Sequence, residues 1–108
     1  MKRIWAIATG IVLALMVFVP SAWAGDVDGA QIFTNNCAAC HLGGGNVING
    51  AKTLKMADLT ANGKDTVEAI QTQVTNGNGA MPAFGGRLTE SEIEAVANYV
   101  LAQADSGW

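Results

Sequence analysis

The stretch Cys37-Ala38-Ala39-Cys40-His41 constrains this chain more than any other. Two cysteines separated by two residues lie one helical turn apart, and a histidine follows directly. At this spacing both thiols can reach one edge of a porphyrin, and the histidine can present an imidazole to its iron. The pattern C-x-x-C-H is typical of covalent haem attachment, and it occurs once. We therefore predict one haem c, bound through Cys37 and Cys40, with His41 as an iron ligand.

The paired cysteines also allow three other interpretations: a redox-active pair, a structural zinc site and a plain disulfide. A thioredoxin-like pair requires a β-α-β setting, and no run of β-branched residues flanks the motif. A structural zinc site needs four Cys or His ligands, whereas the chain offers only Cys37, Cys40 and His41. A disulfide would leave the adjacent histidine without a role. Haem attachment is the interpretation that uses all three residues.

The first 24 residues are typical of a secretory signal peptide. Lys2 and Arg3 precede an apolar run at 4–19, and the small-x-small sequence Ala22-Trp23-Ala24 follows Pro20. The run is shorter than the ~18–20 apolar residues of a membrane span, which disfavours the alternative of an uncleaved anchor. We expect residues 1–24 to be removed after export, which leaves one small domain at 25–108.

The remaining domain is acidic. Without Lys2 and Arg3 it has four basic residues against nine acidic ones, a formal charge of −5. This balance argues against nucleic acid as a partner. So short a chain buries little apolar surface, and a covalently bound cofactor would add to its core.

Residues 25–108 predict helices separated by glycine-rich loops. Three helix starts have the spacing of a capping box: Asp28/Gln31, Asp65/Glu68 and Thr89/Glu92. A glycine-rich stretch at 42–57 predicts a loop that travels around the haem, and a second stretch at 78–86 predicts a loop that faces it. No segment alternates like a strand. We expect an all-α fold of about four helices wrapped around one haem.

The second iron ligand decides what such a haem can do. An open position allows oxygen or peroxide chemistry, whereas two protein ligands favour electron transfer. His41 is the only histidine, and the domain after the leader contains two methionines, Met56 and Met81. Met81 lies in a loop bent by Gly77 and Pro82, whereas Met56 lies at the start of a short helix. We predict Met81 as the second ligand and Met56 as a core residue.

The order of these motifs resembles the class I monohaem cytochromes c. The shared features are Gly29-x-x-x-Phe33, Cys37 to His41, Met81-Pro82 and a last helix with Tyr99. Further stretches look like the cyanobacterial cytochrome c6 family: Asn46-Val47, Lys52-Thr53-Leu54, Gln73-Val74-x-Asn76-Gly77, Ala80 to Phe84, Gly86-Arg87-Leu88 and Gly107-Trp108. The resemblance covers the whole region after the leader.

This resemblance implies a soluble electron carrier of the thylakoid lumen with the class I cytochrome c fold. It implies the cytochrome b6f complex (cytochrome f) as donor and photosystem I as acceptor, with a terminal oxidase served in some members. Gln73 matches the family glutamine that lies near the haem and tunes its potential. The usual proline-rich segment after the haem histidine is missing here. The partner of the second His41 nitrogen therefore stays open between Asn46 and a neighbouring backbone carbonyl.

For the contact surface we expect the apolar residues Ala80, Ala83 and Phe84, with Arg87 beside them. Carriers that release quickly use small interfaces, in which an apolar centre gives contact and rim charges give orientation. Arg87 is the only cation between the Met81 loop and the last helix. Its alternative role is an internal ion pair or a haem-propionate contact. We expect a monomer.

Two rival functions are also compatible with parts of the sequence. A respiratory carrier in a bacterial periplasm would use the same His41 and Met81 ligands and differ only in its partners. A haem peroxidase or gas sensor would instead need an open distal side with acid–base groups. With one histidine and a methionine placed to close that side, we expect no enzymatic activity.

Overall fold

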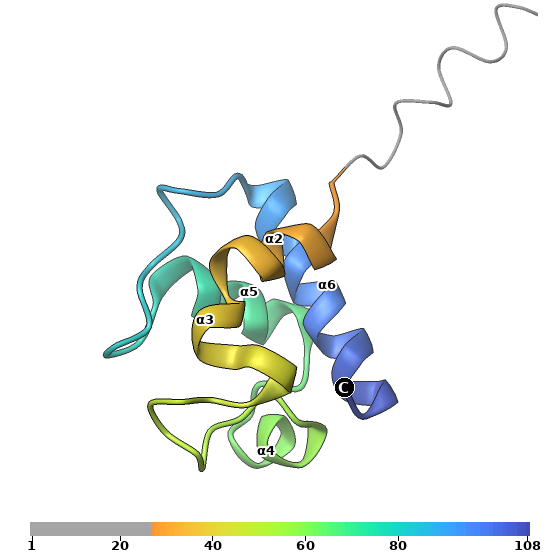
Figure 1. Ribbon diagram of the computed structural model, residues 1–108. Helices are drawn as coiled ribbons and strands as arrows, with labels where there is room; N and C mark the ends of the chain where they lie inside the picture. The colour runs from red at the N-terminus through yellow and green to blue at the C-terminus, as the bar shows by residue number, and fades with distance from the viewer. Residues whose placement is uncertain (1–26) are drawn as a thin grey trace, which may run out of the picture.

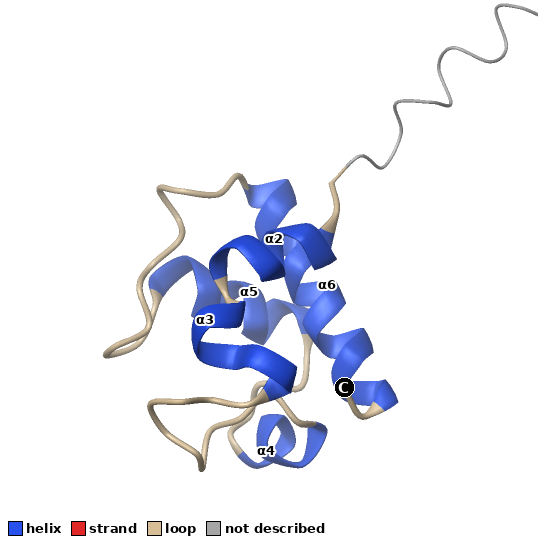
Figure 2. Ribbon diagram, in the orientation of Figure 1, coloured by secondary structure: helices blue, strands red, loops and turns tan. Residues whose placement is uncertain are grey.

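The structure is a computed structural model that describes residues 27–108, a helical body without strands in that range (Figures 1 and 2). Its elements are α2 (Gly29–Asn36), α3 (Ala38–His41), η1 (Leu42–Gly44), α4 (Met56–Ala61), α5 (Val67–Asn76) and α6 (Glu90–Ser106). The predicted all-α fold is confirmed. The expected signal peptide lies outside the described residues. None of the described helices combines the length and apolarity that crossing a bilayer demands.

The last helix begins as its sequence predicts. The Thr89 hydroxyl accepts a hydrogen bond from the Glu92 backbone N–H, and the Glu92 carboxylate accepts one from the Thr89 N–H. This reciprocal capping box satisfies two backbone donors at the helix start. α6 then runs for 17 residues and carries one side of the core.

The other two predicted capping boxes are wrong in detail. Asp28 does cap α2, because its carboxylate accepts from the backbone N–H groups of Ala30 and Gln31. The Gln31 side chain, however, donates to Asn35 one turn further along. At α5 the cap is Thr66, not Asp65: the Thr66 hydroxyl accepts from a backbone N–H in the first turn. A threonine one residue later offers the same kind of acceptor, so spacing alone does not fix the start.

α2 and α6 cross in close contact at Gly29 (Figure 1). A Cβ atom on Gly29 would lie 2.3 Å from the Ala95 carbonyl oxygen and 2.9 Å from Tyr99 Cβ. Only glycine lets the two helix backbones approach this closely. The contact joins the first and last helices, and α5 packs against α6 as well.

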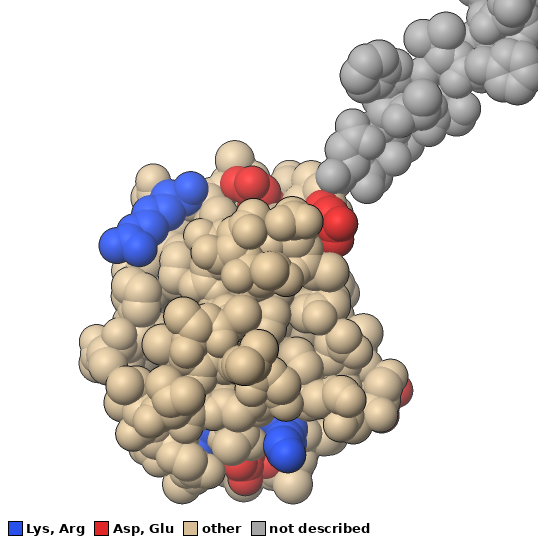
Figure 3. Space-filling view, viewed as in Figure 1, with Lys and Arg blue, Asp and Glu red and all other residues tan. Residues whose placement is uncertain are grey.

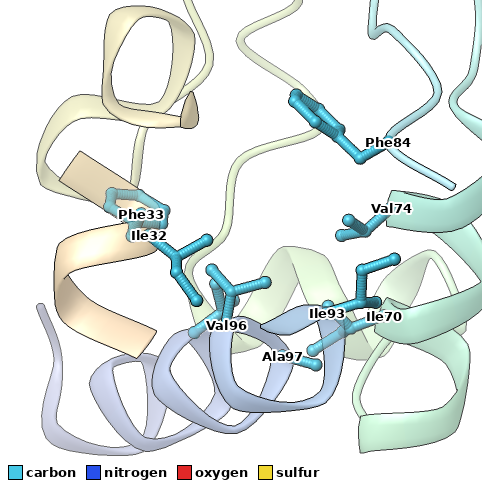
Figure 4. Close-up of a cluster of buried hydrophobic side chains, with 9 residues drawn as sticks. Ile32, Phe33, Ile70, Val74, Phe84, Ile93, Val96 and Ala97 are labelled. Carbon is cyan, nitrogen blue, oxygen red and sulfur yellow. The ribbon is translucent and has the colours of Figure 1, made fainter. Parts of the chain in front are cut away.

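A cluster of buried apolar side chains joins α2, α5 and α6 (Figure 4). Its members are Ile32, Phe33, Ile70, Val74, Phe84, Ile93, Val96, Ala97 and Val100. Val96 and Ala97 are 1% and 0% exposed. Phe84 is the one member from the long loop between α5 and α6, so this cluster also anchors that loop.

Candidate functional site

A cavity of about 460 Å³ lies among α3, the loops around it, α5 and the loop that follows α5. Its volume is in the range of ligand-binding sites. All five site residues expected from the sequence line this cavity: Cys37, Cys40, His41, Gln73 and Met81. Of the described residues, Met56 is not among those that line it. The fold therefore brings together side chains that are up to 44 positions apart in the sequence.

The two cysteines and the histidine share one turn of backbone. Cys37 stands between α2 and α3, and its carbonyl accepts from the N–H groups of Cys40 and His41 at 3.2 and 3.0 Å. The two cysteines do not form a disulfide with each other; Cys37 is half-buried and Cys40 is exposed. Burial raises the pKa of the Cys37 thiol to about 11. A thiol whose pKa is raised is a poor redox nucleophile, which argues against a redox-active pair.

The metal-site alternative has no further support in the part of the chain that the structure describes. No group of three or more His, Cys, Asp or Glu side chains there could surround a metal ion. The cysteines are accompanied only by His41. This arrangement favours thioether attachment over zinc binding.

The orientation of His41 is fixed by its own loop. His41 Nδ1 lies 2.8 Å from the backbone carbonyl oxygen of Gly45. A carbonyl only accepts, so Nδ1 carries the proton and Nε2 keeps a lone pair, which is the tautomer that a metal needs. The Asn46 side chain, the other candidate, instead donates to the Lys52 carbonyl and accepts from the Ile48 and Asn49 N–H groups.

A tight turn presents Met81. The backbone groups of Asn78 and Met81 pair in both directions at 3.0 Å. Before the turn, Gly77 has φ 70°, and a Cβ there would lie 2.6 Å from the Met81 carbonyl oxygen. Gly77 thus lets the end of α5 and the Met81 loop pack together. From α5, the Gln73 amide lies 3.7 Å from the Met81 sulfur.

The rest of the lining suits a porphyrin. Most of the wall is apolar, with Phe33, Leu54, Leu59, Ile70, Val74, Phe84, Val96 and Val100. Polar groups are also present, including Lys52, Thr53, Asn62 and Lys64. A haem combines an apolar ring with two carboxylates, and thiols, an imidazole and a thioether are its usual protein partners. The residues present therefore fit haem c. Neither lysine was expected at the site: Lys52 appears only as part of the family-like stretch Lys52-Thr53-Leu54, and no motif or periodicity marks Lys64.

The expected contact surface needs one correction. Phe84 is only 5% exposed and lies in the core, so it cannot be an apolar surface contact. Its backbone N–H donates to the Val74 carbonyl at 2.9 Å, which ties the loop to α5 and turns the ring inward. Ala80, Ala83 and Arg87 are exposed. The Arg87 guanidinium carbon lies 5.5 Å from the centre of the Phe84 ring, a cation–π contact.

Helices gathered around one cavity lined by a C-x-x-C-H motif define a c-type cytochrome of class I. The family model described as cytochrome C oxidase, cbb3-type, subunit III matches residues 25–100. Among curated relatives, cytochrome c6 of Microcystis aeruginosa is 72% identical over 81 residues, which are 75% of this chain and 100% of that protein. Cytochrome c6 of Synechocystis sp. is 55% identical over 107 residues, covering 92% of this chain and 89% of the relative.

Solved structures agree with these relatives. The crystal structure of cytochrome c6 from the diatom Phaeodactylum tricornutum has a TM-score of 0.71 at 56% identity, covering 74% of this chain and 94% of that one. The crystal structure of cytochrome c6C from Synechococcus sp. has a TM-score of 0.72 at 49% identity, covering 74% of this chain and 98% of that one. The chain belongs to the cytochrome c6 family. It is an electron-carrying cytochrome with one covalently bound haem c.

Proposed function

We propose that this protein shuttles electrons from the cytochrome b6f complex to photosystem I in the thylakoid lumen. In this proposal haem c is joined to Cys37 and Cys40, and His41 and Met81 are its axial ligands. The observation that carries the proposal is that these four side chains line one cavity. When bound, haem supplies a one-electron iron couple whose potential depends on the axial ligands.

The chain's own residues hold and tune that couple. The Gly45 carbonyl keeps the proton on His41 Nδ1, so Nε2 is the free donor. A neutral thioether from Met81 favours ferrous over ferric iron and gives a comparatively high potential. With His41 and Met81 both bound to the iron, no position would remain open for oxygen or peroxide. The protein is accordingly a carrier and not an enzyme.

The docking surface that we propose is smaller than the one expected from sequence. It consists of the exposed Ala80 and Ala83 of the Met81 loop, with Arg87 at its edge. One face of the molecule is broadly uncharged, with charged side chains near its margins (Figure 3). Such a surface suits a short-lived complex, in which apolar contact is weak and rim charges set orientation and on-rate.

The same proposal includes cleavage of the leader at residues 1–24 and export of the protein to the thylakoid lumen. Cleavage after Ala24 would release the domain at 25–108 on the far side of a membrane. The respiratory alternative in a periplasm uses the same site. The relatives named cytochrome c6, at 53–72% identity, favour the photosynthetic role that the family resemblance implies.

Flash-induced kinetics test the proposal. Ferrous holoprotein is mixed with isolated photosystem I, and re-reduction of the oxidised primary donor is followed after a flash. We expect a rate that rises linearly with protein concentration, as for a bimolecular donor. A rate that is independent of the protein, together with rapid oxidation by respiratory membranes, would favour the periplasmic alternative.

A further inference from the structure

The C-terminal residue, Trp108, is folded back against the loop that follows the haem motif. Gly107 caps the end of α6, and its φ of 89° turns the chain. The Trp108 N–H donates to the Gln103 carbonyl at 2.8 Å. Trp108 itself has φ 58° and is the one non-glycine residue with positive φ in the described range. That conformation is unfavourable for a bulky side chain, so its contacts must offset the cost.

The Trp108 side chain contacts the base of the loop from Gly44 to Leu54. Its indole Nε1–H donates to the Leu54 carbonyl at 2.9 Å, a bond between residues 54 positions apart. Its ring lies against Gly44, where a Cβ atom would be 2.5 Å from Trp108 Cγ. On its other sides the ring packs on Phe33 and Tyr99, with ring centres 5.4 and 6.2 Å away.

These contacts lead to the haem histidine in three short steps. The Leu54 N–H donates to the Gly44 carbonyl at 2.8 Å, so both backbone groups of Leu54 are bonded, one to Trp108 and one to Gly44. The next residue, Gly45, carries the carbonyl that accepts from His41 Nδ1. Gly44 and Gly45 have no side chains of their own to hold them, and Gly44 has φ 82°, a region that only glycine enters readily.

We propose that Trp108 is a positioning residue for the haem: it clamps Gly44 and Leu54 and thereby holds the Gly45 carbonyl in place for His41. This inference rests on the proposed function, because it takes His41 as the iron ligand. A firmly held Nδ1–H bond makes the imidazole a stronger donor, which stabilises ferric iron. Loosening the carbonyl weakens that bond and favours ferrous iron. The C-terminus therefore takes part in setting the potential.

Two substitutions of Trp108 separate the contribution of its aromatic ring from that of its indole N–H. Trp108→Phe keeps an aromatic ring on Gly44 and removes the indole N–H, whereas Trp108→Ala removes both. Leu101→Ala is the matched control, because Leu101 packs on the core from the same helix but does not line the cavity. The readouts are solvent exchange of the His41 Nδ1 proton, followed by NMR in the ferrous holoprotein, and the midpoint potential.

We expect exchange to accelerate at least about tenfold in Trp108→Ala, because local opening of the clamp becomes easier. The potential shifts upward in the same variant, and Trp108→Phe lies between it and the unsubstituted protein. Leu101→Ala lowers the melting temperature and leaves both readouts unchanged. Unchanged exchange and potential in Trp108→Ala would overturn the proposal, whatever happens to melting. If Trp108→Ala yields no holoprotein, the test rests on Trp108→Phe. Unchanged proton exchange and unchanged potential in Trp108→Phe would then overturn the proposal.

A separate measurement tests whether His41 is an iron ligand. In the unsubstituted ferric protein, the ring protons of an iron-bound His41 carry large paramagnetic shifts. Their absence would contradict the proposed function, and with it the premise of the clamp. Their presence, together with no response to Trp108 substitution, would overturn only the inference about Trp108.

Discussion

The side-chain amide of Gln73 donates a hydrogen bond to the sulfur of Met81 across 3.7 Å. The two residues come from different segments: Gln73 lies in α5 and Met81 in the loop beyond it. Both line the cavity of the candidate haem site. A donor aimed at a thioether withdraws electron density from it, so Gln73 is placed to influence how strongly Met81 would bind iron in the proposed site.

The first prediction concerns this pair. Gln73→Leu keeps a similar side-chain size and removes the N–H donor and its dipole. The sulfur becomes a better donor to ferric iron, so the midpoint potential falls. A hydrogen bond worth about 1 kcal/mol corresponds to about 40 mV for one electron, and redox titration measures it. Gln71→Leu is the control, because Gln71 is on the same helix but does not line the cavity. A rise in potential, or equal shifts in both variants, would contradict this role.

The two methionines give a second, paired prediction. Met81→Ala opens one axial position, so ferrous protein takes up carbon monoxide and the potential falls by an amount on the order of 100 mV. Met56→Ala does neither, since Met56 does not line the cavity. The visible spectrum before and after carbon monoxide is the measurement. Carbon monoxide uptake by the Met56 variant alone would exchange the two assignments.

The third prediction concerns the crossing of α2 and α6. Gly29→Ala places a methyl group 2.3 Å from the Ala95 carbonyl oxygen, so the helices must separate. Overpacking of this kind costs about 2 kcal/mol, which lowers Tm by about 10 °C in a domain of this size. Gly50→Ala is the control, because a Cβ there meets nothing within 4 Å. Thermal unfolding of both holoproteins tests this, and equal Tm values would show that the crossing tolerates a side chain.

Arg87 gives a fourth prediction, about docking. Arg87→Ala slows reduction of photosystem I by about fivefold at low salt and weakens its salt dependence, because a rim charge mainly affects on-rate. Lys55→Ala removes an equal charge from an exposed site that does not line the cavity and leaves the rate nearly unchanged. Because Arg87 also lies over the Phe84 ring, potential and Tm are measured in parallel. If the potential or the Tm of Arg87→Ala shifts enough to explain the slower rate, Arg87 belongs to the haem pocket and not to the docking surface.

The fifth prediction concerns processing. We expect the purified holoprotein to begin at Gly25 and to carry one haem, because the leader ends in Ala22-Trp23-Ala24 and C-x-x-C-H occurs once. Intact mass measures both. A product that retains Lys2 and Arg3 and requires detergent would support the membrane-anchor alternative.

Features encoded by neighbouring residues were predictable from sequence. The capping box of Thr89 and Glu92 needs only a spacing of three, and the structure has both of its hydrogen bonds. Among the residues expected at the haem site, Cys37, Cys40 and His41 come from a local motif and Met81 from a choice between two methionines. Gln73 comes only from the family resemblance. That these residues line one cavity, however, depends on the packing of α5 and the Met81 loop onto the helical core.

Features that depend on tertiary packing were not predictable. Phe84 looks like a surface residue in a glycine-rich loop, yet its bond to Val74 turns it into the core. Thr66 caps α5 although Asp65 has the conventional spacing. Trp108 appears only as part of the family-like pair Gly107-Trp108, which says nothing about what its side chain contacts. Its contacts with Gly44 and Leu54 connect segments more than 50 residues apart, and no sequence periodicity reports such a contact.

In the proposed site, His41 and Met81 would together close both axial positions of one haem. Proton NMR of the ferrous holoprotein tests this ligation most directly, because the ring current of a porphyrin strongly shifts the methyl group of a methionine bound to its iron. We expect one methionine methyl signal far upfield, which Met81→Ala abolishes and Met56→Ala retains. Two methionine methyl signals at ordinary positions in the unsubstituted protein would contradict the account.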